Sequence, residues 1–379
     1  MSKQVNPYLE RYGAFLYPDL DAKGKREKED LLKSPVKAIV PSRVRTVADM
    51  IRAMGDMSIQ ARNVGLAYQV LEEMLADVDR PTILLGLAGP LIAGGLRQVI
   101  REMVEYGLVD VVVSTGAILY QDLYQARGYN HYKGEVEADD KRLRDLFIDR
   151  IYDTYVDEVG FGKTDSWVAA FADSLEPGNY SSRQFLAALG EVIEDPLSIL
   201  GTCARRGVPV FAPALNDSSI GIGLTEHHHR LVTEGARGVA INSIQDNYEL
   251  TQIIALSPAT AAIYVAGGVP KNYINDSVVM SYIFGREDKG HRYAIQMSTA
   301  VTADGGLSGS TLDEAKSWGK IRKGAHRAMA WVEPTVALPL LVTAALQEKL
   351  HEGRKRLGFT WEGQLLKKLD VPESAASSS

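Results

Sequence analysis

The 379-residue sequence contains a single cysteine, Cys203, no basic block and no long hydrophobic segment. One cysteine excludes an intrachain disulfide and a cysteine-cluster metal site. Lysine and arginine number 42 against 48 aspartates and glutamates, a net charge of −6, so nucleic acid is not an expected partner. No apolar run reaches the ~18 residues of a membrane span, and the first residues lack the apolar core of a signal peptide. We therefore expect a cytoplasmic protein with no membrane partner.

Motifs of several enzyme classes are missing as well. There is no Gly-x-Ser-x-Gly elbow, and acidic residues such as Asp157 and Glu158 fit solvated helix faces better than an acid/base pair. Serine hydrolase and glycosidase chemistry are therefore disfavoured. The one histidine cluster is 227–229, but adjacent side chains on a helix point in different directions and no Glu-x-x-His frame surrounds them. We expect no metal site.

Short segments rich in valine and isoleucine alternate with segments of helical periodicity through most of the chain. The expected strands are 81–87, 109–114, 208–212, 238–242, 261–265, 293–297 and 326–332. The expected helices are one or two over 47–77, then 91–106, 118–126, 141–156, 181–193, 196–206 and 334–352. Apolar strands of this kind are typical of parallel sheets buried on both faces. The alternation predicts an α/β fold with an open, mostly parallel sheet and helices on both faces.

Composition divides the chain into three parts. Residues 1–45 are polar and mixed in charge, which predicts an N-terminal arm. Residues 46–370 are predicted to form one catalytic domain, with 127–180 as an insertion in the sheet order. Residues 371–379 end in a serine-rich, low-complexity stretch, which predicts a disordered tail.

Small and polar residues follow one expected strand after another. In open α/β sheets, ligands bind outside the carboxyl ends of the strands, where glycines let backbone N–H groups approach a phosphate. Tight turns would also explain these glycines, and the Gly-x-Gly-x-x-Gly spacing is absent. Their repetition is what favours a dinucleotide site. The residues concerned include Ser114, Thr115, Gly116, Asp217, Gly267, Gly268 and the segment 299–308.

Lys320 is the candidate reactive group, in the stretch 307–321. A free lysine has a pKa of ~10.4, so a nucleophilic lysine needs its ammonium form destabilised, for example in an apolar pocket. Trp318 precedes Lys320 by two residues, and Glu314 shares a helix face with Trp318. Ser310 is the predicted N-cap of this short helix. A surface lysine behind a glycine-terminated helix fits the same spacing.

The segment 308–321, S-G-S-T-L-D-E-A-K-S-W-G-K-I, resembles the active-site segment of deoxyhypusine synthase. Segments beginning at Val109, Pro209, Ala266 and Leu338 are also similar to that family, in the same order. The resemblance implies a Rossmann-like fold and a homotetramer with NAD and substrate sites at subunit interfaces. It also implies a reaction in which NAD takes hydride from the butylamine part of spermidine. The resulting imine passes to a lysine, and the aminobutyl group then goes to an acceptor amine.

The resemblance also implies roles for single residues. Lys320 matches the imine-forming lysine, Trp318 packs along the substrate chain, and Glu314 anchors near the lysine. Together with the glycines that follow the strands, the predicted NAD-binding residues are Thr115, Asp217, Gly267, Gly268, Thr299, Asp304, Ser308 and Glu333.

Five positions depart from the family where it binds substrate. Tyr120 and Gln121 stand where two glutamates are usual, Ile222 and Leu307 replace aspartates, and Asn272 replaces a histidine. Each lost carboxylate removes an anchor worth ~1.5 to 3 kcal/mol for a substrate ammonium. The lysine and NAD chemistry are therefore predicted to be kept, while the amine-recognition site is rebuilt.

These observations predict an NAD-dependent transferase of aminobutyl or related alkylamine groups, with a small polyamine as the acceptor. One alternative is true deoxyhypusine synthase or homospermidine synthase activity on spermidine, with anchors supplied by other residues such as Glu226 or Asp276. A second alternative is a non-catalytic NAD-binding scaffold that kept the fold.

Overall fold

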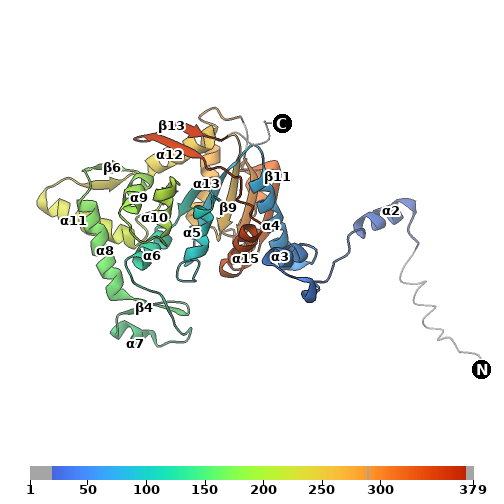
Figure 1. Cartoon of the computed structure of the whole chain (residues 1–379), viewed down its shortest axis with the longest axis horizontal. Coiled ribbons are helices and arrows are strands. Elements are labelled where there is room, and N and C mark those ends of the chain that lie inside the picture. Colours follow the sequence, from blue (N-terminus) through green and yellow to red (C-terminus); the bar gives the residue numbers. More distant parts are fainter. Residues whose placement is uncertain (1–18, 288–289, 373–379) are drawn as a thin grey trace, which may run out of the picture. The chain divides into compact units, whose positions relative to one another are not determined.

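The computed structural model describes residues 19–287 and 290–372 (Figure 1). The chain divides into two units, 1–38 and 39–379. In the first unit, the described part contains helix α2 (Ala22–Leu31), none of whose residues is buried. The rest of the predicted arm before residue 19, and the predicted tail from 373 onward, lie outside the described residues.

The second unit is built on a six-stranded sheet in the order β11-β10-β9-β1-β2-β7. Every neighbouring pair is parallel, so the predicted open parallel sheet is confirmed. The strands are β1 (Thr82–Leu87), β2 (Val111–Ser114), β7 (Val210–Phe211), β9 (Thr260–Val265), β10 (His291–Met297) and β11 (Ile321–Ala330).

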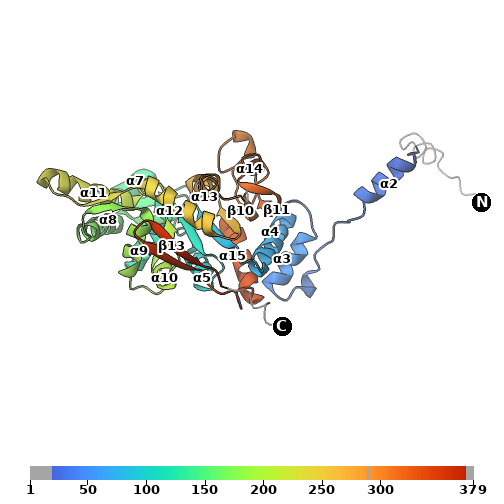
Figure 2. The same ribbon diagram turned by 90° about the horizontal axis from the view of Figure 1, so that it is seen from above.

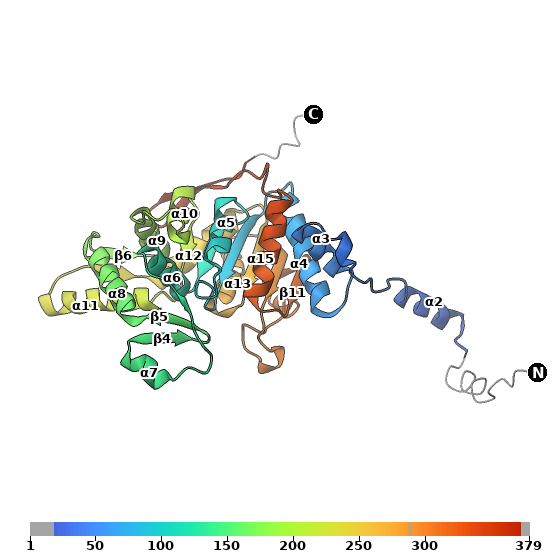
Figure 3. The same cartoon turned by 60° about the horizontal axis from the view of Figure 1, so that its bottom comes forward.

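Helices cover both faces of this sheet because its strands are apolar on both sides. In β1, Ile83 and Leu85 belong to one hydrophobic core and Leu84 to the other. Figure 3 shows α4 and α15 side by side over the first face, and Figure 2 shows α12 and α13 together, which pack on the second. The first face carries α3 (Val47–Gly55), α4 (Ile59–Ala76), α5 (Arg97–Glu105) and α15 (Pro334–Gln347), and the second α12 (Ser243–Leu256) and α13 (Gly268–Ser281).

The predicted insertion lies between β2 and β7, which are neighbours in the sheet. The predicted helix 141–156 is wrong, because only α7 (Asp140–Asp145) forms and an antiparallel hairpin follows. Phe147, whose φ is +56°, follows the end of α7, and Tyr152, whose φ is +54°, forms the turn of the hairpin. Between β2 and β7 the chain contains α6 (Gly116–Ala126), β3 (Tyr132–Lys133), β4 (Ile148–Ile151), β5 (Thr154–Asp157), α8 (Glu158–Asp173), β6 (Gly178–Tyr180), α9 (Ser182–Glu191) and α10 (Ile199–Arg206), of which α6, α9 and α10 lie outside the predicted insertion 127–180.

Further elements differ from the sequence-based expectations, and α12 and α13 were not among the expected helices. The expected strand at 238–242 forms as β8 (Val239–Ile241), but it pairs with β6 (Gly178–Tyr180) outside the main sheet. The antiparallel hairpin of β12 (Gly358–Glu362) and β13 (Leu365–Asp370) was not expected. The long α11 (Ser219–Glu234) precedes β8. Within the described ranges, no helix has the length and apolar character needed to cross a bilayer.

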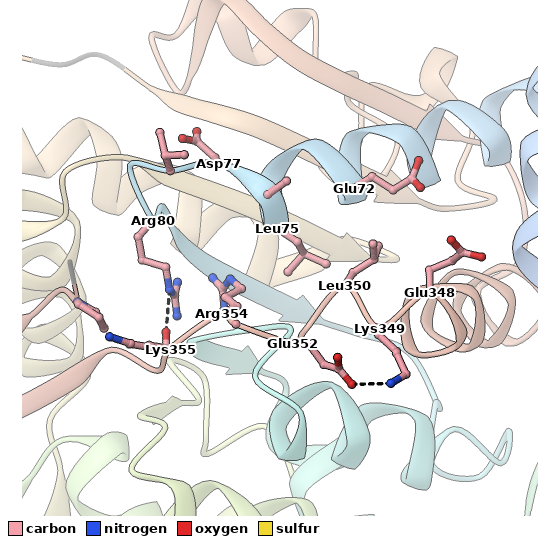
Figure 4. A pocket seen from close by; sticks show the side chains of 14 residues that line it. Glu72, Leu75, Asp77, Arg80, Glu348, Lys349, Leu350, Glu352, Arg354 and Lys355 are labelled. Carbon is pink, nitrogen blue, oxygen red and sulfur yellow. Dashed lines mark hydrogen bonds and ion pairs between the residues drawn. The ribbon is translucent and has the colours of Figure 1, made fainter. Parts of the chain in front are cut away.

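The amino-terminal end of the sheet is organised by a buried carboxylate, Asp110. Arg80 donates to one of its oxygens at 2.8 Å and Arg354 to the other at 2.7 Å. The Ile83 N–H donates at 2.9 Å. A cavity of about 450 Å³ opens beside the two arginines, where Arg80 also reaches the carbonyl of Lys355 (Figure 4). This cavity lies at the opposite end of β1 from the residues that the sequence singles out.

A second buried carboxylate, Asp246 on α12, predicts a pH-dependent stability. Its Oδ1 accepts from the Ser182 hydroxyl at 2.8 Å, whereas its Oδ2 has no partner among the described residues. Burial raises the pKa of Asp246 to about 7 from an ordinary 3.8. Ionisation therefore costs the folded state more than the unfolded state, and stability is lost as pH rises between these two values.

Asp246→Asn should therefore stabilise the protein by about 2 to 4 kcal/mol near neutral pH, with the gain shrinking toward about pH 4. Thermal melting across this range measures it. The exposed Asp145→Asn serves as the control and should show no such trend. A difference between Asp246→Asn and wild type that is constant with pH would contradict this assignment.

Candidate active site

The ends of the parallel strands form one continuous edge. The Thr115 N–H donates to the Leu87 carbonyl at 3.1 Å, linking the ends of β2 and β1. At the other side of the sheet, the Ala266 N–H donates to Met297 at 2.8 Å and the Ser298 N–H to Ala330 at 3.1 Å. Thr115 therefore lies at the same edge as Gly267 and Gly268, two strands or about 10 Å away.

Gly267, Gly268 and Ser308 meet at this edge. The Gly268 N–H donates to Ser308 Oγ at 2.9 Å. A Cβ on Gly267 would lie 2.6 Å from Ser308 Cα, so only glycine allows this approach. Gly268 has φ +59°, which also favours glycine. The structure thus brings together three of the residues predicted to bind NAD.

The edge has the features that a dinucleotide requires. The N-cap residues Thr115 and Gly267 make no side-chain cap to α6 and α13, although the first N–H of α13, that of Gly268, is taken by Ser308 Oγ. Helix starts of this kind are suited to phosphate. Asp217, exposed after β7, directly precedes Ser218, whose Oγ lies 2.4 Å from where a Cβ of Gly116 would stand. Asp217 is therefore close to the start of α6, where a carboxylate can accept from a ribose hydroxyl.

The remaining predicted NAD-binding residues differ in whether their side chains are free to contact a ligand. Thr299 and Asp304 are exposed in the loop after β10. The Glu333 carboxylate accepts from the Thr335 N–H at 2.7 Å and so caps α15. Glu333 lies at the correct edge, but its carboxylate is engaged in this cap.

Lys320 is held against α13. Its Nζ lies 3.0 Å from Asp276 Oδ1, 3.3 Å from Asn272 Oδ1 and 5.4 Å from the centre of the Trp318 ring. The Lys320 side chain is 15% exposed, whereas Trp318 is 71% exposed. The lysine is thus partly desolvated, and the tryptophan beside it forms an open wall.

Position along α13 links Lys320 to the edge. Asn272 and Asp276 follow Gly268 by one and two helical turns, so Lys320 Nζ lies roughly 6 to 12 Å from the start of the helix. The Tyr282 hydroxyl donates to the Gly319 carbonyl at 2.7 Å and holds the backbone before Lys320. Gly319 has φ +70°, which turns the chain into β11.

A second lysine, Lys271, was not singled out from the sequence. It is 1% exposed, and its Nζ donates to the Leu307 carbonyl at 3.1 Å and to the Ser310 carbonyl at 2.6 Å. Burial, reinforced by Lys320 nearby, lowers its pKa to about 8. Helical periodicity is the sequence pattern that could have identified Lys271 as buried, because it shares one face of α13 with Ile274 and Val278.

The short helix before Lys320 is capped differently from the prediction. Ser310 does not cap it, since its Oγ accepts from Lys271 at 2.9 Å. Instead, Thr311 Oγ1 accepts from the Glu314 N–H at 3.0 Å, and Glu314 Oε2 accepts from the Thr311 N–H at 2.5 Å. The Thr311 N–H lowers the pKa of Glu314. Glu314 therefore positions α14 (Glu314–Ser317), which carries the chain to Trp318.

The five departures from the family are dispersed. The Tyr120 hydroxyl is buried and donates to the Phe161 carbonyl at 2.7 Å, joining α6 to α8. Gln121 is also buried and accepts from the Ala93 N–H at 3.2 Å. Ile222 is 57% exposed on α11, and Leu307 contributes its carbonyl to Lys271. Asn272 is the departure that contacts Lys320.

His227 of the histidine cluster is buried and hydrogen-bonded within the protein. It is 1% exposed, its Nδ1 lies 2.5 Å from Asp173, and its Nε2 accepts from the Val239 N–H at 3.0 Å. These bonds join α8, α11 and β8. Across residues 19–287 and 290–372, no three His, Cys, Asp or Glu side chains are grouped as metal ligands.

Lys271→Met should loosen the stretch that carries Lys320. Two carbonyls and a hydroxyl lose their buried donor, at a cost of about 1 to 3 kcal/mol. Hydrogen exchange at the amides of 307–320 should accelerate. The exposed Lys323→Met is the matched control and should leave exchange unchanged. Equal exchange in both variants would show that Lys271 does not hold this stretch.

Known proteins resemble this chain over most of its length. The sequence model described as deoxyhypusine synthase matches residues 49–345. A deoxyhypusine synthase-like protein of Chlorobaculum parvum is 42% identical over 339 residues, covering 88% of this chain and 95% of that protein. A Methanosarcina mazei protein named probable deoxyhypusine synthase 2 is 40% identical over 327 residues, covering 84% and 92%.

A solved structure shares the fold. The crystal structure of a proposed deoxyhypusine synthase from Entamoeba histolytica superposes with a TM-score of 0.56 at 17% identity, covering 82% of this chain and 97% of that one. The family match and the level of identity to the bacterial and archaeal relatives lead to one conclusion: this chain belongs to the deoxyhypusine synthase family, a family of transferases.

Proposed function

We propose that the protein is an NAD-dependent transferase that moves an aminobutyl or related alkylamine group, through an imine on Lys320, to a small polyamine acceptor. The observation that carries the proposal is the environment of Lys320. The Lys320 amine is partly buried against α13. It lies within two helical turns of Gly267 and Gly268, at the edge of the sheet that suits a dinucleotide. Family membership supplies the reaction class.

The chain's own groups have distinct tasks in this reaction. Gly267, Gly268 and Ser308 would hold NAD, which would supply reversible hydride transfer at the carbon next to a donor nitrogen, so that no net oxidation occurs. Neutral Lys320 adds to the imine carbon of the oxidised donor, and the remaining amine leaves with a proton. The acceptor amine then adds to the same carbon and displaces Lys320, while Trp318 packs along the alkyl chain.

The altered anchors favour a small acceptor over a protein lysine. Tyr120 and Gln121 are buried and bonded internally, and Ile222 and Leu307 offer no carboxylate. A substrate ammonium therefore finds fewer counter-charges than the family pattern provides. Asp276 is the carboxylate that contacts Lys320 within the described residues.

We also propose that the working form is a homo-oligomer, a tetramer as the family implies, with sites at subunit interfaces. The supporting observation is Trp318, which is 71% exposed beside a lysine that is 15% exposed. A nucleophilic lysine such as Lys320 reacts best when water is excluded, and the exposed Trp318 ring beside it has to be covered for that. A second copy of the chain would provide it.

Incubation with NAD and labelled spermidine, with and without putrescine, tests the proposal. We expect a labelled low-molecular-weight transfer product whose yield rises with putrescine. Label found on a lysine of an added acceptor protein would favour true deoxyhypusine synthase activity. Unchanged spermidine in both reactions would favour the scaffold and contradict the proposed enzyme.

A further inference from the structure

We propose that Asp276 is the subsite for a positively charged nitrogen of the substrate, and that the incoming cation frees Lys320 by taking over its carboxylate partner. The inference rests on the proposed imine chemistry and adds to it a residue that binds the substrate. The preferred donor is an alkylamine with at least two cationic nitrogens. A monoamine that presents no second cation would leave Lys320 paired.

The resting arrangement is a shared carboxylate. Asp276 Oδ1 lies 3.0 Å from Lys320 Nζ, and Asp276 Oδ2 accepts from Asn272 Nδ2 at 2.9 Å. An ammonium in such a pair has no free electron pair, so the pair has to open before Lys320 can add to an imine. The Asp276 side chain is 46% exposed, which leaves it within reach of a dissolved cation.

The charged groups around Lys320 decide what happens after the exchange. Lys271 lies on α13, the helix that also carries Asp276. Glu314 lies on α14, and its carboxylate accepts from the Thr311 N–H. Once Asp276 pairs with a substrate cation, Lys320 faces Lys271 and a new positive charge. Like charges disfavour an ammonium pair, and Lys320 has to give its proton to water before it can add to an imine.

The exposed face of Trp318 defines the rest of the subsite. Its ring centre is 5.4 Å from Lys320 Nζ, and most of its surface is open. An alkyl chain can pack on this ring, and aromatic faces also attract cations. Asp276 and Trp318 together therefore suit an ammonium followed by a methylene chain, with the second nitrogen held away from Asp276.

Reductive labelling of the full-length protein with propanal and cyanoborohydride tests the exchange without NAD. Peptide mass spectrometry gives a rate for each lysine. Near neutral pH, Asp276→Asn should label Lys320 about three- to tenfold faster than wild type, because its counter-charge is gone. N,N,N′,N′-tetramethyl-1,4-diaminobutane, a dication that cannot form an imine, should accelerate Lys320 labelling in wild type but not in Asp276→Asn.

The pair of Lys316 and Asp313 provides a matched control, with a 2.9 Å ion pair and a lysine that is 22% exposed. Asp313→Asn should leave the labelling of Lys320 unchanged. Asp276→Glu keeps the charge and should label at nearly the wild-type rate, which separates charge from any folding defect. Lys320 labelling that is unchanged in Asp276→Asn, or slowed by the dication in wild type, would overturn the proposal. Because labelling needs no turnover, absence of transfer activity would count separately against the proposed function.

Discussion

Lys320→Ala should lower the rate of amine transfer by about 10³-fold or more, with NAD affinity nearly unchanged. The reason is that no other described amine can replace it. Lys271 is 1% exposed and is tied to the Leu307 and Ser310 carbonyls, so it has no access to substrate. Steady-state transfer from labelled spermidine measures the rate, and titration of NAD measures the affinity.

Two comparisons separate chemistry from charge. Lys320→Arg keeps the positive charge beside Asp276 but cannot form an imine, so it should be as inactive as Lys320→Ala. Lys316→Ala removes a nearby lysine that pairs with Asp313 and should retain most of the activity. Substantial transfer by Lys320→Arg would mean that Lys320 acts only through its charge.

Asp110→Asn should destabilise the protein by about 3 to 5 kcal/mol, the largest loss expected from any single substitution considered in this protein. Asp110 is 4% exposed, and the change leaves the guanidiniums of Arg80 and Arg354 buried without their counter-charge. Chemical denaturation followed by circular dichroism measures the loss. Asp313→Asn, which weakens exposed ion pairs with Lys316 and Arg327, should cost less than about 1 kcal/mol.

Asp110 also predicts how the stability of the folded protein falls at low pH. Burial acts to raise the pKa of Asp110, but Arg354 and Arg80 outweigh it and hold the pKa at about 2. Because this is below the ordinary value of 3.8, its stabilisation is present above that value and is lost as pH falls toward 2. Asp110→Asn should therefore lose stability relative to wild type near neutral pH but much less at about pH 2. An equal loss at both pH values would contradict the pairing.

Much of the fold followed from the sequence because apolar strands buried on both faces leave a local signal. Each of the six strands of the main sheet overlaps an expected apolar run, although β11 begins at Ile321, five residues before the expected start. The β4–β5 hairpin could not be predicted from the sequence, because its residues are mostly only partly buried. Its turn also depends on Tyr152, which has a positive φ. The partner of β8 was missed because strand pairing is a long-range property.

The candidate site was only partly accessible from the sequence. The glycine turn at 267–268 and Lys320 were identifiable from local chemistry and resemblance. The contacts of Lys320 with Asn272 and Asp276 were not identifiable, because these residues are 48 and 44 positions away in sequence and meet only when the chain folds back along α13. Tyr120 and Gln121 were interpreted as changed substrate positions, and their buried bonds to Phe161 and Ala93 depend on the insertion and the β1 loop.

The most direct test of the central claim is to locate the adduct after borohydride trapping. The protein is incubated with NAD and labelled spermidine, reduced with borohydride, digested and mapped by mass spectrometry. We predict a single labelled amine, Lys320, with no labelled peptide in Lys320→Ala. Label on another lysine, or an adduct that persists in Lys320→Ala, would contradict the assignment of Lys320 as the imine-forming residue.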